Sequence, residues 1–194
     1  KPAAYSSGDS TFKSPIKLGM VSRLQPIKDH RTLLDGFYLL STLDPSRDYE
    51  LHIAGEGPTY EDIRKYINAL SLSDSVCMHG LLSPLDISLL LQSLHIYIHL
   101  TDGETMSNSI LQAMATCLPI IATDVSGVNN CLTVNEAILI PPRSAYDLAS
   151  AIITLATNQS LSSRLASNSL LKVQNTNSPS SISLLYINVI HSLI

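Results

Sequence analysis

The feature that most constrains the fold is a repeated alternation between short apolar runs and longer segments with helical character. The apolar runs have the length of strands and are nearly continuous, which is typical of strands buried on both faces. They cover residues 16–21, 49–55, 75–80, 94–100, 119–123 and 137–142. Strands that alternate with helices predict an α/β fold, in which helices cover both faces of a mostly parallel sheet.

The segments between the apolar runs carry the spacing and the start signals of helices. A helix is expected from about Asp29 to Ser41, because its apolar side chains repeat at i, i+1, i+4 and i+7. "SPLD" at 83–86 matches a capping box, with Ser83 as the N-cap and Asp86 in place of the usual Glu. A final helical region is expected from Ala145 onward.

Composition narrows the class of protein. The chain has 194 residues, of which 45% are hydrophobic and 14% charged, so it can build one substantial core and is not disordered. A net charge of −4 argues against nonspecific binding of nucleic acid, but it permits a local positive pocket for a small anion. No apolar run is long enough to span a bilayer, so we expect a soluble protein, with attachment to a membrane surface left open.

The cysteines predict a reducing environment. There are three, Cys77, Cys117 and Cys131, an odd number without CxxC spacing. We interpret them as reduced core thiols of a cytoplasmic protein.

The loops that directly follow strands are the places to look for a site. In open parallel sheets, ligands bind in the crevice beyond the carboxyl ends of the strands. Four loops meet this condition: 22–28, 55–58, 79–83 and 101–107.

Loop 22–28 carries two cations, Arg23 and Lys28, on either side of a proline. A guanidinium fork and an ammonium point charge together suit a diphosphate, although two solvated surface cations would look the same. "GEGP" at 55–58 resembles the start of a dinucleotide fingerprint, but Tyr60 stands where the third glycine is required. We interpret that loop as a tight turn between strand and helix.

The segment "GETMSNSILQAMATCLPIIATD" at 103–124 combines a polar helix start with a buried strand. Free N–H groups at a helix N-terminus form an anion site, so phosphate could contact the backbone around Thr105, Met106 and Ser107. Glu104 lies just outside, where it could bond sugar hydroxyls. Gln112 follows eight residues later, about 12 Å along a helix. The alternative is an ordinary N-cap with a Gln that faces solvent.

Histidines provide little further evidence. His95 and His99 are about 13 Å apart on a strand, too far for one metal ion, so no metal site is expected. His79 either lines a pocket for a nucleotide base or merely ends its strand. No nucleophile elbow is visible.

Three separated segments, in the same order, resemble the C-terminal, nucleotide-sugar-binding half of GT-B glycosyltransferases of the large retaining family 4. They are "GMVSRLQPIKDHRTLLDGF", "LHIAGEGPTYEDIRKYINALSLSDSVCMHGLLS" and "GETMSNSILQAMATCLPIIATDVSG". The resemblance runs from about Ile16 to Ala156. It implies a Rossmann-like three-layer sandwich that needs neither cofactor nor metal.

The resemblance also implies roles for individual residues. Arg23 and Lys28 would hold the diphosphate of the donor, and Glu104 would contact the donor sugar as the catalytic carboxylate. Gln112 matches the position of a Glu that bonds the ribose. The remaining residues expected to bind the donor are Thr105, Met106, Ser107, Asn108 and His79.

The sequence departs from the family pattern at three places. Gln112 replaces the second Glu, and Thr105 stands where the family usually has Gly. Asn129 and Asn130 occupy positions where an acidic residue is common. A neutral amide at 112 loses a charge-assisted hydrogen bond, which weakens binding by roughly 1–2 kcal/mol.

The domain organisation follows from the same resemblance. We expect a linker at 1–14, a nucleotide-sugar-binding domain at 15–175, and a C-terminal helix at 176–194 that packs back on that domain. The acceptor-binding N-terminal half of the family is missing, so the chain should be a fragment that is inactive alone.

The predicted function is the binding of a UDP- or GDP-sugar for a retaining hexosyltransferase. The acceptor would be a glycan or a lipid-linked molecule held by the missing half, and nucleic acid is not expected as a partner. A cytoplasmic location is implied, with peripheral association at the inner face of the membrane for the full enzyme. The alternative is a noncatalytic nucleotide-binding or interaction module on the same fold.

Overall fold

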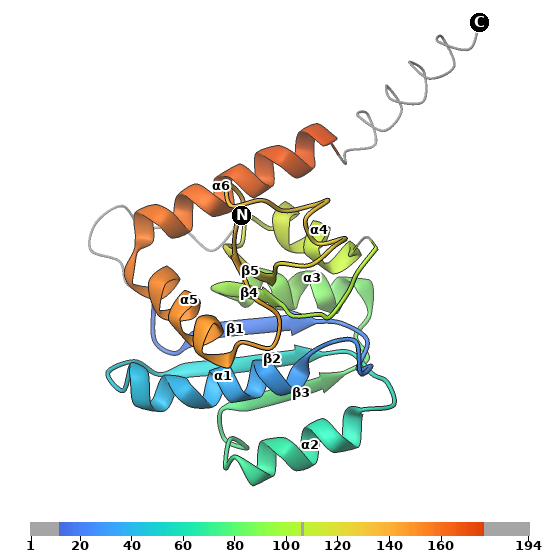
Figure 1. The fold of residues 1–194 in the computed structure, drawn as a ribbon, viewed down its shortest axis with the longest axis vertical. Helices are drawn as coiled ribbons and strands as arrows, with labels where there is room; N and C mark the ends of the chain where they lie inside the picture. Colours follow the sequence, from blue (N-terminus) through green and yellow to red (C-terminus); the bar gives the residue numbers. More distant parts are fainter. Residues whose placement is uncertain (1–11, 106, 177–194) are drawn as a thin grey trace, which may run out of the picture.

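The computed structural model describes residues 12–105 and 107–176, which form a six-stranded sheet with helices on both faces (Figure 1). The strands are β1 (Ile16–Val21), β2 (Tyr49–Ala54), β3 (Val76–Gly80), β4 (Ile96–His99), β5 (Ile120–Thr123) and β6 (Ala137–Ile140). The helices are α1 (His30–Leu43), α2 (Tyr60–Ala69), α3 (Pro84–Ser93), α4 (Asn108–Ala115), α5 (Ala145–Thr157) and α6 (Gln159–Thr176). All neighbouring strands pair in parallel, so the predicted α/β architecture is confirmed.

Two apolar layers hold the sheet between its helices. On β1, Leu18 and Met20 face the layer that contains the apolar sides of α1, α2 and α5. Val21 faces the opposite layer, together with the apolar sides of α3 and α4. This alternation follows from the twofold side-chain period of a strand. The long helix α6 contributes Leu165 to the first layer and Val173 to the second.

The order of the strands determines where a site can form. The order β3-β2-β1-β4-β5-β6 reverses direction between β1 and β4, which are neighbours in the sheet but not in the sequence. Ligands of doubly wound sheets bind at such a switch point. An antiparallel bridge between Lys28 and Thr101 joins the two loops that leave these strands.

The predicted helix starts agree with the structure at two positions. Asp29 caps α1 by accepting the N–H of Thr32 at 3.0 Å. Ser83 caps α3 by accepting the N–H of Asp86 at 3.2 Å, and its hydroxyl donates to the Asp86 carboxylate at 2.6 Å. Both helices therefore begin where their side-chain chemistry predicts.

Two predictions concern the ends of the chain. Most of the expected linker at 1–14 and nearly all of the expected terminal helix at 176–194 lie outside the described residues, so both stay predictions. Among the residues that the structure does describe, no helix has the length and apolar character needed to cross a membrane.

Candidate functional site

A pocket of ≈ 540 Å³ opens at the carboxyl ends of the central strands, at the switch point between β1 and β4. Its walls come from the loops after β1, β2, β3 and β4 and from the first turns of α4. It brings together six of the residues predicted from the sequence: Arg23, Lys28, Glu104, Ser107, Asn108 and Gln112. Side chains that are up to 89 positions apart in the chain therefore share one cavity because the parallel strands end at the same edge.

A carboxylate and two basic groups meet on one side of this pocket. The Lys28 ammonium forms a close ion pair with Oε2 of Glu104, and both side chains are mostly buried. Nε2 of His99 lies 3.4 Å from the same carboxylate oxygen. Because a carboxylate can only accept, the His99 tautomer that bonds to it carries its proton on Nε2. Nδ1 of His99 is then a buried acceptor, and it has no partner among the described residues.

Glu104 is held as an anion. Burial tends to raise the pKa of this carboxyl group, but the hydrogen bond and charge of Lys28 outweigh burial. The N–H of Thr105 donates to Oε1 at 3.2 Å and acts in the same direction. The net result is a pKa below the usual value for Glu, so Glu104 is ionised at neutral pH.

Two buried histidines, His99 and His30, lie next to Glu104 and Lys28. Burial lowers the pKa of His99 to about 4, with Lys28 adding to the effect and Glu104 opposing it. Burial likewise lowers the pKa of His30 to about 4. His30 donates from Nδ1 to the carbonyl of Lys28 at 3.0 Å, and its Nε2 accepts from the Ser22 hydroxyl at 3.2 Å. His30 therefore fixes the backbone that carries Lys28. Neither His30 nor His99 was assigned a role from the sequence.

The helix at the pocket begins later than the sequence suggested. We expected Thr105 to open it, but α4 starts at Asn108, and Ser107 is the N-cap whose hydroxyl accepts the N–H of Ile110 at 3.4 Å. The N–H of Thr105 already serves Glu104, and Thr105 does not line the pocket. The N–H groups of Asn108 and Ser109 occupy the first turn, where the helix dipole favours an anion. Met106 lies outside the described residues.

Arg23 and Gln112 present exposed polar groups at the mouth of the pocket. Within residues 12–105 and 107–176, no acidic side chain forms an ion pair with Arg23. Its charge is therefore available to a ligand, in contrast to that of Lys28.

Close backbone contacts fix the loops of the pocket, and two glycines allow them. Gly55 has φ +136°, and a Cβ built there would lie 1.9 Å from the carbonyl oxygen of Ser22. Gly127 has φ +92°, and its Cβ would lie 1.7 Å from the carbonyl oxygen of Glu104. The turn expected at 55–58 is thus confirmed. The close approach of Gly127 fixes the loop that carries Glu104. The nearby Asn129 donates to the Asp124 carboxylate at 2.8 Å.

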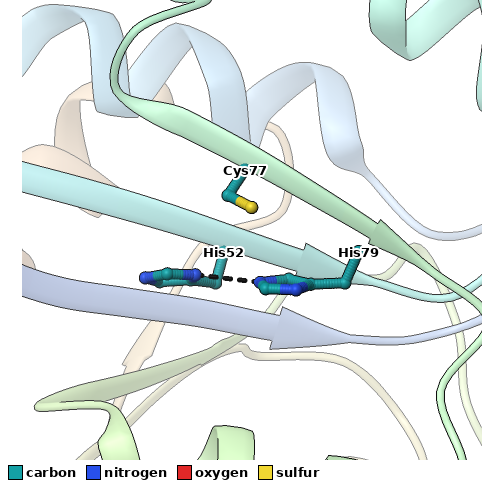
Figure 2. A group of neighbouring side chains, drawn as sticks. All are labelled: His52, Cys77 and His79. Carbon is teal, nitrogen blue, oxygen red and sulfur yellow. Dashed lines mark hydrogen bonds between the residues drawn. The ribbon is translucent and has the colours of Figure 1, made fainter.

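His79 is placed elsewhere by the structure. It does not line the pocket, and its Nε2 lies 2.9 Å from Nδ1 of His52 on the neighbouring strand. Cys77 stands beside this pair (Figure 2). The expectation that all three cysteines are core thiols was wrong, because Cys77 is exposed and only Cys131 is buried. An edge strand has one face that helices do not fully cover, and the sequence does not reveal which face that is.

Comparison with known proteins assigns the fold and the family. The solved structures that resemble the chain include the following three, each at less than 25% identity, and these similarities show the fold. Anabaena HepE in complex with UDP and glucose has a TM-score of 0.74 at 21% identity, over 82% of this chain and 44% of that one. The C-terminal domain of the Francisella tularensis group 1 glycosyltransferase LpcC has a TM-score of 0.75 at 17% identity, over 84% of this chain and 87% of that one. The sucrose-phosphate synthase of Thermosynechococcus elongatus has a TM-score of 0.80 at 20% identity, over 92% of this chain and 45% of that one.

Two curated proteins are similar to the chain in sequence. The alpha-D-kanosaminyltransferase of Streptomyces kanamyceticus is 31% identical over 123 residues, which are 63% of this chain and 32% of the relative. The alpha-monoglucosyldiacylglycerol synthase of Streptococcus pneumoniae is 26% identical over 113 residues, 58% of this chain and 25% of the relative. The matches thus span a third or less of these relatives. The family described as "Glycosyl transferases group 1" matches residues 15–158, and the chain belongs to this family of GT-B glycosyltransferases.

Proposed function

We propose that the chain is the donor-binding domain of a retaining glycosyltransferase that transfers a hexosyl group from a UDP- or GDP-sugar. The observation that carries the proposal is the convergence of Arg23, Lys28 and Glu104 with the N-terminus of α4 in one pocket at the switch point of the sheet. Two cations and a helix N-terminus suit a diphosphate, and a carboxylate beside them suits the hydroxyls of a sugar.

Each group has a part in binding the donor. Arg23 and Lys28 bind the diphosphate and stabilise the charge that develops on it as the sugar leaves. The N–H groups of Asn108 and Ser109 bind a phosphate oxygen. Glu104 contacts the donor sugar, and Gln112, on the outer side of α4, accepts a hydrogen bond from a ribose hydroxyl.

Binding of the donor requires a rearrangement of the ion pair. Without ligand, Lys28 donates to Glu104, and each neutralises the other. A diphosphate would compete for the Lys28 ammonium, and Glu104 would then be free to accept from the sugar. The neutral His99 keeps a hydrogen-bond donor next to Glu104 in both states without adding a charge.

The acceptor, a glycan or a lipid-linked molecule, would bind to a second domain that faces the pocket. Family members match this chain over only part of their length, which supports that arrangement. The name of one curated relative, a monoglucosyldiacylglycerol synthase, fits a lipid acceptor. We therefore expect the chain alone to bind the donor and to transfer nothing, and the full enzyme to meet a lipid acceptor at the membrane surface.

A noncatalytic nucleotide-binding module is the second candidate. The neutral Gln112 at the ribose position favours it, because an amide bonds a ribose hydroxyl less strongly than a carboxylate does.

Calorimetric titration with UDP, GDP and ADP tests the proposal. We expect one diphosphate to bind with a micromolar to millimolar Kd, and Arg23→Ala to weaken that binding by at least tenfold. Arg64→Ala is the matched control, since Arg64 is an exposed cation on α2 that pairs with Glu61, away from the pocket. If no diphosphate binds, or if both variants bind like the wild type, the donor site is wrong.

A further inference from the structure

A cluster of metal-binding side chains lies on the sheet outside the donor pocket. The parallel register pairs His52 of β2 with Cys77 of β3, and His79 follows two positions later on the same strand. The side chains all project from one face of the two strands (Figure 2). One ligand atom from each residue lies within 4.8 Å of the others. Two imidazoles and a thiol therefore converge on one point.

The two nitrogens of His52 have different surroundings. The His52 side chain is about nine-tenths buried, yet its Nε2 has no hydrogen-bond partner among the described residues. The nearest carboxylate oxygen, Oε1 of Glu50, lies 3.6 Å away, beyond hydrogen-bond distance. Nδ1 of His52, by contrast, shares a proton with Nε2 of His79, and the two nitrogens are 2.9 Å apart. Nδ1 of His52 is therefore hydrogen-bonded to a second histidine, whereas Nε2 of His52 has no hydrogen-bond partner among the described residues.

We propose that His52, Cys77 and His79 form a binding site for a divalent transition metal, preferentially Zn²⁺. Imidazole nitrogen and thiolate are the ligands that this ion prefers, and three of them leave one tetrahedral position for water. Zn–N bonds of about 2.0–2.1 Å at a tetrahedral angle separate two nitrogens by about 3.4 Å. The two nitrogens, now 2.9 Å apart, therefore need to separate by about half an ångström, and the rings need to turn so that both lone pairs face the ion. The exposure of Cys77 gives the ion a path from solvent.

Binding of the ion fixes the tautomer of each ring. To ligate the ion, Nδ1 of His52 and Nε2 of His79 must both offer lone pairs, so the proton between them moves to the other nitrogen of the ring that carries it. His52 then carries its proton on Nε2, which faces Oε1 of Glu50 at 3.6 Å. A small approach of the Glu50 side chain would complete the carboxylate–histidine–metal arrangement common in zinc sites. The thiol of Cys77 loses its proton to solvent as the metal–sulfur bond forms.

The ion would connect β3, the edge strand, to β2 close to the donor pocket. Gly55 N–H, directly after β2, donates to the carbonyl of Gly80 at the end of β3 at 2.8 Å. Leu81 and Leu82, which follow Gly80, line the pocket. Bound there, the ion would stiffen the strand ends from which one pocket wall extends.

Titration of the 194-residue chain with Co²⁺, a spectroscopic substitute for Zn²⁺, tests the site. We expect one equivalent to bind and to give thiolate-to-cobalt charge-transfer absorption, which Zn²⁺ then abolishes by displacement. Cys77→Ser should remove the absorption, because it removes the thiolate. Cys117→Ser is the matched control, since it also replaces a cysteine but lies outside the cluster, and it should keep the absorption.

Thermal unfolding provides a second readout that does not depend on absorption. Zn²⁺ at a hundredfold excess over its Kd should raise the Tm of the wild type by about 5 °C or more. The same addition should leave the Tm of His79→Ala unchanged. The proposal is refuted if Co²⁺ gives no charge-transfer absorption, if the absorption persists in Cys77→Ser, or if Zn²⁺ stabilises His79→Ala as much as the wild type.

Discussion

Gly127→Ala should damage the donor pocket without touching any side chain that lines it. The added Cβ would lie 1.7 Å from the carbonyl oxygen of Glu104, whereas real Cβ contacts essentially never fall below 3.0 Å. One of the two loops must therefore move by at least about 1.3 Å, the difference between these two distances. Because Gly127 is buried, the movement is expected in the loop that carries Glu104.

The expected loss in the free energy of unfolding has two parts. Alanine at φ +92° adopts a conformation that L residues disfavour by about 1–2 kcal/mol. The displaced loop also loosens the ion pair between Glu104 and Lys28, so we expect a total loss of about 2–3 kcal/mol in the free energy of unfolding. A shift of more than 1 Å at a binding carboxylate should in addition weaken UDP-sugar binding about tenfold or more.

Urea denaturation and calorimetric titration measure these two effects on the same preparation. Gly103→Ala is the matched control, because Gly103 lies in the same loop as Glu104 but its Cβ would meet only the Ile27 side chain at 3.8 Å, an ordinary contact. Gly103→Ala should behave nearly as the wild type. If Gly127→Ala unfolds and binds like Gly103→Ala, then the close approach does not position Glu104, and the reasoning fails.

Two further predictions concern the ribose contact and the buried histidines. Gln112→Glu should tighten binding of the preferred diphosphate about tenfold by calorimetry, because a carboxylate bonds a ribose hydroxyl more strongly than an amide does; unchanged affinity would remove Gln112 from the site. Stability should fall as the pH drops from about 6.5 toward 4, because the folded-state pKa of His30 and of His99 is about 4 and the unfolded chain takes up protons first. Between pH 7 and pH 5 this amounts to about 2 kcal/mol for each ring, which equal urea midpoints at the two pH values would contradict.

The sequence predicted the fold well because local patterns determine it here. Short, nearly continuous apolar runs favour buried strands. The apolar spacing of α1 and the capping box of α3 place these two helices without tertiary information. Ligands of parallel sheets bind beyond the carboxyl ends of the strands, so the loops after the strands could be identified as the site. Arg23, Lys28 and Glu104 lie in these loops and Gln112 lies on the helix that follows, and the structure places all four around one pocket.

What the sequence could not provide depends on register and on close contacts. His52 and Cys77 are 25 positions apart, and only the pairing of β2 with β3 makes them neighbours. The helix α4 starts at Asn108, after the N-cap Ser107, and not at Thr105, whose N–H bonds to Glu104. Periodicity does not record such a contact of backbone with side chain. The glycine in "DVSGVNN" was visible, but its partner, the carbonyl of Glu104, lies 23 positions earlier.

The charges around the pocket explain why this domain should need a partner. Among the described residues that line it, Arg23 and Lys28 carry positive charge, while Glu56 and Glu104 carry negative charge. The four side chains cancel, so the N-terminus of α4 is the remaining source of attraction for a diphosphate, and it contributes only about half an elementary charge. Lys28 must also leave Glu104 before it can bind phosphate. Weak binding by the chain alone follows from this balance. A cation contributed from outside the domain would raise the affinity, because it would give the pocket a net positive charge.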